Sequence, residues 1–103
     1  MDGDSVRFLE TWFKEQCDDD WEHSYKIEMG TLDNPGWWLR VDQSETDLEG
    51  LETGWVKVDR SEDDWVHHHA DGRVFEAFGG AQNLVDLLDS FRLFATSTHR
   101  AVD

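Results

Sequence analysis

Apolar and polar residues alternate in two stretches in the first half of the chain. Over residues 21–29 the odd positions are mainly aromatic or aliphatic, and over residues 37–42 the odd positions are again apolar. A period of two residues predicts a strand with one buried and one exposed face. Asn34-Pro35-Gly36 lies between the stretches and suits a tight turn, because proline fixes φ and glycine tolerates a positive φ. These residues therefore predict an antiparallel hairpin.

Three further stretches in the second half of the chain have the character of strands. They cover residues 55–60, 65–70 and 73–78, and each is rich in aromatic or β-branched residues. Residues 61–64 are polar and mostly acidic, which favours a turn, and Asp71-Gly72 is a two-residue hairpin signal. Strands three, four and five are therefore expected to follow one another through short turns.

Two stretches repeat their apolar residues every three to four positions, which is the period of an amphipathic helix. Asp4 or Ser5 is placed to cap the first helix, which is expected to run to about Gln16. The second helix is expected over residues 82–96. The predicted buried stripes are Phe8, Leu9, Trp12 and Phe13 on the first helix, and Leu84, Leu87, Leu88, Phe91 and Ala95 on the second.

Together these elements predict an α+β fold. Five consecutive strands with short turns favour an antiparallel meander sheet, and the N-terminal and C-terminal helices are expected to pack on one face of it. Residues 43–53 are expected to form an acidic connecting loop with Leu48 and Leu51 as its apolar anchors. We expect a single domain over residues 1–103, with an ordered core at about 5–96 and a frayed segment from Ser97.

Composition adds a strong negative charge to this picture. Leu, Ile, Val and Phe make up 24 of 103 residues, close to the level at which charged chains stay disordered, but six tryptophans can anchor a core. Twenty-four acidic residues against nine basic ones give a formal charge of −15. Such a field repels nucleic acids and anionic membranes and attracts basic partners, although acidity also serves solubility alone.

The remaining global features place few constraints on function. Cys17 is the single cysteine, so an internal disulfide and a cysteine-based zinc site are excluded. The N-terminus has neither a basic region nor an apolar segment of the kind found in secretion signals, and no apolar run reaches membrane-spanning length. We therefore expect a cytoplasmic protein; its oligomeric state is open, with a monomer favoured.

Two clusters invite a catalytic or metal-binding interpretation. His67-His68-His69 lies in a predicted strand, where neighbours point to opposite faces, so only His67 and His69 could converge on a metal ion. A run of acidic residues beside His23 resembles an acid–base pair, but such chemistry requires a cleft that shifts pKa values. A polar strand face and a solvated turn explain these clusters better, so we expect no catalytic residues, no metal and no cofactor.

Several short stretches together point to a known family. Residues 20–25 read DWEHSY and residues 31–37 read TLDNPGW, and both strings are specific. The further residues in the pattern are Trp12, Phe13, Gln16, Cys17, Asp18, Arg60, Ser61, Glu62, Asp64, Trp65, Gly79, Gly80, Asn83 and Leu84. In these residues the chain resembles the immunity protein 53 family of bacterial polymorphic toxin systems, from about Phe8 to Phe94.

Three positions depart from the family pattern. Members often have glycine where Asp19 and Lys26 stand, and proline where Ala81 stands. These departures leave the expected fold intact and bear on local turn geometry. The histidine run is not a signature of the family.

The resemblance implies a non-enzymatic α+β immunity protein that binds and neutralises a cognate toxin. Many toxin domains of such systems attack nucleic acids through basic clefts, so an acidic inhibitor gains association rate and specificity. Two alternatives stay open. One is a small metal-dependent enzyme that uses His67, His69 and nearby carboxylates, and the other is an acidic mimic of nucleic acid that regulates a basic host protein.

Two acidic groups are the candidate toxin-binding surface. The first lies around the expected 43–53 loop, and residues 41–56 contain no lysine or arginine. The second follows the third strand and is relieved by Lys57 and Arg60. Trp38 is a candidate aromatic anchor at the rim, unless the loop covers it. The acidic candidates are Asp42, Glu45, Asp47, Glu49 and Glu52 in the first group, and Asp59, Glu62, Asp63 and Asp64 in the second.

Overall fold

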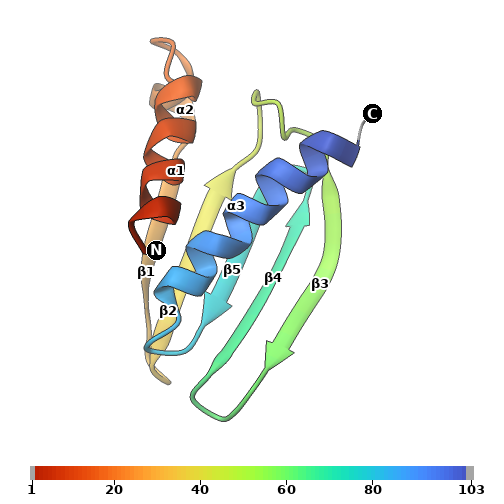
Figure 1. Cartoon of the computed structure of the whole chain (residues 1–103). Coiled ribbons are helices and arrows are strands. Elements are labelled where there is room, and N and C mark those ends of the chain that lie inside the picture. Colours follow the sequence, from red (N-terminus) through yellow and green to blue (C-terminus); the bar gives the residue numbers. More distant parts are fainter. Residues whose placement is uncertain (1, 102–103) are drawn as a thin grey trace.

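The computed structural model describes the backbone of residues 2–101 and the side chains of residues 4–96. Along the chain, one long helix precedes the five strands and another follows them (Figure 1). In chain order the elements are α1 (Asp2–Gln16), α2 (Trp21–Ser24), β1 (Ile27–Leu32), β2 (Gly36–Asp42), β3 (Glu52–Asp59), β4 (Trp65–Asp71), β5 (Val74–Gly79) and α3 (Leu84–Ala101).

The strands form one antiparallel sheet, which confirms the predicted α+β class and the strand number. The predicted meander order is wrong, because the order in the sheet is β1-β2-β5-β4-β3. The β2–β3 loop carries the chain past two strand positions, so that β5 pairs with β2. The reason lies in burial: β2 and β5 supply fully buried residues and take the centre. β3 is exposed at nearly every position and takes an edge.

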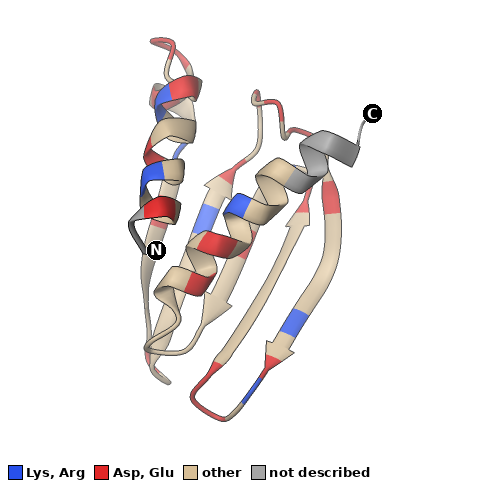
Figure 2. Ribbon diagram, viewed as in Figure 1, with Lys and Arg blue, Asp and Glu red and all other residues tan. Residues whose placement is uncertain are grey.

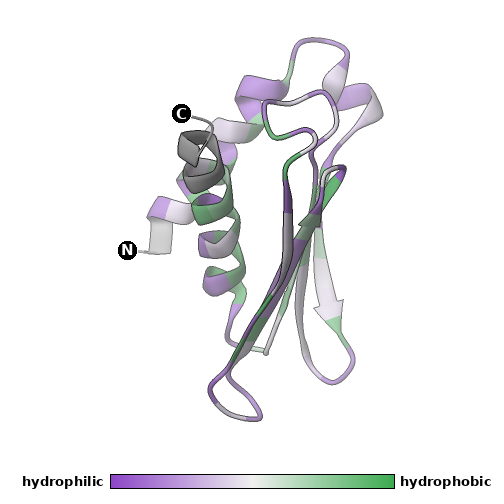
Figure 3. Ribbon diagram, turned by 90° about the vertical axis from the view of Figure 1, so that its right-hand side faces the viewer, coloured by the Kyte–Doolittle hydropathy of each residue, from purple (hydrophilic) through white to green (hydrophobic). Residues whose placement is uncertain are grey.

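Both long helices lie on the same side of the sheet, as predicted (Figure 3). Helix α3 packs on β5, β2 and β4, and α1 packs mainly on α3. The Trp12 ring meets the Phe91 ring edge-on, with 5.1 Å between centroids. The buried core consists of Trp12, Trp21, Leu39, Val41, Leu48, Val66, Ala70, Phe75, Ala77, Leu87, Leu88, Phe91, Phe94 and Ala95.

Several element boundaries differ from the prediction. Strand β3 begins at Glu52 and not at Trp55, so the predicted 43–53 loop ends at residue 51. Helix α1 begins at Asp2, so Ser5 lies inside it and donates a hydrogen bond to Asp89 of α3 instead of capping the helix. Helix α3 continues to Ala101, beyond the predicted end at Thr96. The predicted first strand begins later, at Ile27, because residues 21–24 form the helical turn α2.

Local hydrogen bonds explain why α2 replaces the start of that strand. The Asp18 carboxylate accepts hydrogen bonds from the backbone N–H groups of Asp20 and Trp21, at 3.0 and 2.9 Å. The Glu22 carboxylate reaches back to the N–H groups of Asp18 and Asp19, at 3.0 and 2.9 Å. Carboxylates that satisfy the free N–H groups at a helix start favour helix over strand. Asp18 in the acidic run therefore stabilises the local fold.

Candidate binding surface

The loop between β2 and β3 is held in place by its own buried residues. Gln43 is fully buried, and its Nε2 donates to the carbonyl oxygens of Leu48 and Leu51 at 2.7 and 2.9 Å. Leu48 belongs to the core, and the Trp21 indole donates to the carbonyl of Ser44 at 2.9 Å. Leu48 and Leu51 thus anchor the loop as predicted, and Gln43 is an anchor that the apolar pattern did not reveal.

The carboxylates of this loop project from a fixed backbone. Glu45, Asp47 and Glu49 are exposed, and Glu45 has a φ of 61°. The Glu45 N–H donates to Glu49 Oε1 at 2.8 Å, which links two of the three residues. At the two ends of the loop, Asp42 accepts a hydrogen bond from the Lys26 N–H at 2.8 Å, and Glu52 opens β3 as an exposed residue. The first acidic group is therefore a preformed surface.

The second acidic group contains one carboxylate that is committed to the fold. Asp64 Oδ1 accepts hydrogen bonds from Arg60 and from the Asn83 side chain, both at 2.9 Å. These bonds, with that of Arg60 the stronger, hold the pKa of Asp64 below its usual value. Arg60 also lies 3.5 Å from Asp86 at the start of α3. The turn between β3 and β4 is in this way tied to α3.

Asn83 is the centre of that tie. It is 5% exposed, and its Oδ1 accepts hydrogen bonds from the N–H groups of Trp65 and Gly80, at 3.3 and 3.2 Å. Its Nδ2 donates to Asp64 and Asp86, at 2.9 and 2.6 Å. A side chain at Gly80 would collide with the Asp63 carbonyl, so only glycine fits there. Asp64, Gly80 and Asn83, which belong to the family pattern, therefore hold the β3–β4 turn against the start of α3.

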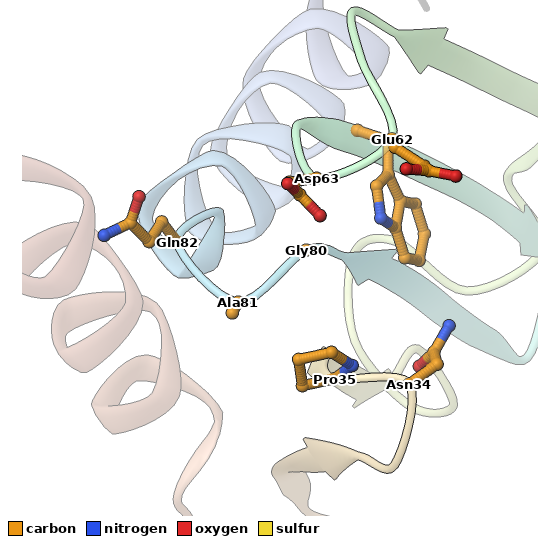
Figure 4. A pocket seen from close by; sticks show the side chains of 8 residues that line it. Asn34, Pro35, Glu62, Asp63, Gly80, Ala81 and Gln82 are labelled. Carbon is orange, nitrogen blue, oxygen red and sulfur yellow. The ribbon is translucent and has the colours of Figure 1, made fainter.

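Glu62 and Asp63 remain available at the same end of the molecule. They line a pocket of about 360 Å³ between the β1–β2 turn, the β3–β4 turn and the segment that leads into α3 (Figure 4). Asn34 and Pro35 form the opposite wall, and the Trp37 indole on β2 donates to the Ala81 carbonyl at 2.9 Å.

The two acidic groups lie at opposite ends of β3, so they do not form one patch (Figure 2). Glu52 opens the strand and Asp59 closes it, which separates them by about 23 Å at roughly 3.3 Å per residue. The partner of Asp59 is a histidine: its Oδ1 lies 2.8 Å from His67 Nε2. A partner that touches both groups must span the sheet.

Trp38 lies between these groups, on the side of the sheet that the long helices leave open. It is half-buried in the middle of a row across the sheet, beside Gly30 of β1 and Phe78 of β5. A Cβ atom at Gly30 would lie 2.7 Å from the Trp38 indole nitrogen, so the glycine gives the ring its place. The predicted anchor is thus part of a sheet face, four residues along β2 from Asp42 and the loop.

This open face carries more aromatic residues than sequence reasoning assigned to it. The Trp55 ring stacks on His69 with 4.1 Å between centroids, and lies 6.2 Å from Phe78. Trp65 contacts His67 at 5.0 Å. The alternation predicted for β4 placed only His67 and His69 on a common face. The strand order was the missing information, since only the β2–β5 pairing brings Trp38 next to Phe78.

The three histidines of β4 divide between the two faces as the strand geometry requires. His67 and His69 share the open face, but each has its own carboxylate: Asp59 at 2.8 Å, and Glu76 at 2.9 Å. His68 points to the helix side, where burial and the neighbouring His69 lower its pKa. Within residues 4–96 no three His, Cys, Asp or Glu side chains are grouped as metal ligands would be.

Comparison with known proteins adds one finding. No curated protein and no solved structure matches the chain. None of the helices in the described part of the chain is both long and apolar enough to cross a membrane. The family model described as immunity protein 53 matches residues 6–96, which is nearly the whole chain. The match agrees with the resemblance carried by the DWEHSY and TLDNPGW strings, and the chain belongs to the immunity protein 53 family.

Proposed function

We propose that this protein binds a cognate toxin domain with a basic, nuclease-type active-site cleft and neutralises it by occupying it, without catalysis. Membership of an immunity protein family supports the inhibitory role. The observation that carries the choice of a basic toxin is the excess of 24 acidic over nine basic residues. The proposed place of action is the cytoplasm of the producing cell, where the inhibitor meets the toxin before harm is done.

Charge supports this role through the association rate. A net charge of −15 attracts a basic cleft over a distance limited by salt, about 8–10 Å at physiological ionic strength. Charged groups at the rim of an interface act chiefly on the rate of encounter. For a toxin that damages its own producer, a fast encounter is the property that an inhibitor needs.

The β2–β3 loop is the proposed steering element. Gln43 and Leu48 fix its backbone, so the backbone at Glu45, Asp47 and Glu49 loses little conformational freedom when a partner binds. Residues 41–56 contain no lysine or arginine to offset these charges. Asp59, Glu62 and Asp63 form a second, more distant acidic group, whereas Asp64 acts within the fold.

The test is the rate of association with the toxin domain encoded beside this gene, measured at several salt concentrations. The variant replaces Glu45→Gln, Asp47→Asn and Glu49→Gln together; glutamine at 49 keeps an acceptor for the Glu45 N–H. The matched control, Glu10→Gln with Glu15→Gln and Asp20→Asn, changes the charge equally on exposed positions elsewhere. We expect the loop variant alone to associate more slowly and with a shallower salt dependence.

Two other outcomes would change the proposal. Equal rates and equal salt slopes for the loop variant and the wild type would exclude the loop as the steering element, and the group at residues 59–64 would take its place. Failure of the wild-type protein to bind or inhibit the toxin domain at equimolar concentration would overturn the proposed function itself.

A further inference from the structure

The side of the sheet opposite the long helices is a second feature that suits a partner. Figure 3 shows α1 and α3 together on one side, and neither of these two helices covers the other side of the five strands. Its central row runs across β1, β2, β5, β4 and β3 through register partners. The residues of that row are Gly30, Trp38, Phe78, His67 and Lys57.

Aromatic side chains in this row and beside it remain partly in contact with solvent. Trp55 is 53% exposed although it stacks on His69, and Trp38, Phe78 and Trp65 are only half-buried. Three of the six tryptophans of the chain thus lie outside the helix-covered core. Exposed tryptophans add little to folding, whereas they are enriched among residues that dominate binding energies.

Charges around the aromatic row favour a basic partner. Six acidic and two basic strand residues point to this face. The acidic residues are Glu28, Asp42, Glu52, Asp59, Asp71 and Glu76, and the basic residues are Arg40 and Lys57. The face already accommodates a cation on an aromatic ring, since the Lys57 Nζ lies 5.7 Å from the centre of the Trp55 ring. An arginine or lysine of a partner could occupy the same kind of position.

The size of the face explains why the acidic ends of the sheet also matter. Five strands of six to eight residues, spaced at about 4.8 Å, give a flat footprint of about 400 Å² at roughly 3.3 Å per residue. A stable complex buries roughly 800 Å² on each partner. A partner centred on the aromatic row therefore has to extend over one or both ends of β3, where the two acidic groups lie.

We propose that the open sheet face docks the toxin domain, with Trp55, Trp38 and Phe78 as its apolar centre and arginine or lysine side chains of the toxin on these rings. This proposal rests on the proposed function and adds the contact surface. The acidic loop governs the rate of encounter, and the aromatic centre governs the lifetime of the complex.

The test compares two exposed apolar residues on opposite sides of the protein. Trp55→Ala removes the most exposed ring of the open face, and Leu93→Ala removes a side chain of α3 that is 64% exposed. Trp55→Phe keeps an aromatic ring. We expect Trp55→Ala to weaken toxin binding about 30-fold or more, mainly through faster dissociation, while Trp55→Phe retains most of the affinity and Leu93→Ala leaves it unchanged.

Circular dichroism and the unfolding midpoint of each variant establish that the fold is intact. Wild-type affinity in Trp55→Ala, or weakening by Leu93→Ala instead, would overturn the docking surface and leave the proposed function standing. A wild-type protein that does not bind the toxin domain would overturn both. Sedimentation of the free protein tests whether a second copy of this chain occupies the face. A wild-type dimer that Trp55→Ala dissociates would assign the face to that second copy and overturn the proposal.

Discussion

The two faces of the sheet arise from the same alternation but contain different residues. At the centre of the sheet the helix side holds apolar residues with no exposed area, such as Leu39, Val41 and Phe75. Near the two edges of the sheet, Met29, Val56 and Val58 on the same side are 41–44% exposed. The open side holds large aromatic rings, histidines and paired charges, with Trp55 more than half exposed. The first composition minimises contact with water, and the second combines apolar area with polar groups. One face is therefore suited to folding, and the other is suited to reversible contact.

The tryptophans divide in the same way. Trp12 and Trp21 are buried in the core and Trp37 packs against it, while Trp38, Trp55 and Trp65 stand on the open face. Composition alone suggests six anchors for a small core. Half of the indole rings lie outside the helix-covered core, and their place on the open face is the main physical argument for the proposed binding surface.

Two phenylalanines of β5 offer the most direct test of the comparison. Phe75 is fully buried and contacts the Phe91 and Phe94 rings at 5.4 and 5.2 Å, whereas Phe78 lies half-buried on the open face. We expect Phe75→Ala to lower the free energy of unfolding by about 3–5 kcal/mol and Phe78→Ala by about 1–2 kcal/mol. Urea denaturation measures both. Equal losses would mean that the open face belongs to the core.

Asn83 tests whether the helix side depends on packing alone. Asn83→Ala removes four hydrogen bonds and leaves the Trp65 N–H without its Asn83 acceptor, while the Gly80 N–H keeps the Trp65 carbonyl oxygen at 3.3 Å. Because unsatisfied buried donors are costly, we expect a loss of about 2–4 kcal/mol in the free energy of unfolding. The neighbouring Gln82 is exposed, and Gln82→Ala is expected to cost less than about 0.5 kcal/mol. A loss no greater in Asn83→Ala than in this control would show that packing suffices.

The sequence predicted the helix-covered face better than the arrangement of the strands. The stripe of Leu87, Leu88 and Phe91 on α3 is buried as its spacing required, because a helix period depends only on neighbouring residues. Strand order depends on contacts between distant residues, and the alternation within a strand does not specify which strand lies beside it. The short turns before and after β4 favoured a consecutive order, and the long β2–β3 loop was the signal against it.

The candidate surface was predicted in part for the same reason. The acidic residues of the 43–51 loop are exposed, and their close spacing could be seen in the sequence. Asp64 resembles its acidic neighbours in the sequence, yet its partners Arg60 and Asn83 make it a structural residue. Asp19 has a φ of 77°, a conformation that glycine adopts more easily. Only the folded backbone reveals such constraints.

The histidine run allows the comparison to be tested by pH. Burial lowers the pKa of His68 below the ordinary value of about 6.5, which the unfolded chain retains. As the pH falls through that value, the unfolded state takes up a proton before the folded state, so the free energy of unfolding decreases. We expect His68→Leu to show a smaller decrease between about pH 7.5 and 5.5 than the wild type, in urea titrations at each pH.

His67→Gln is the matched control, because it removes an imidazole from the open face of the same strand. A decrease in His68→Leu as large as that of the wild type would show that other groups cause the acid sensitivity. The distinction between a buried and an accessible histidine would then have no consequence for stability.

Lys57 is expected to give the smallest effect and tests whether the open face contributes to folding at all. Its ammonium lies over the Trp55 ring, but the site is exposed, and such contacts contribute about 0.5 kcal/mol. We expect Lys57→Gln to change the free energy of unfolding by less than about 0.5 kcal/mol. Removal of a positive charge from a face that meets a basic toxin should raise the association rate about twofold at low salt. A slower association would indicate that Lys57 faces an acidic partner surface, contrary to the proposed docking.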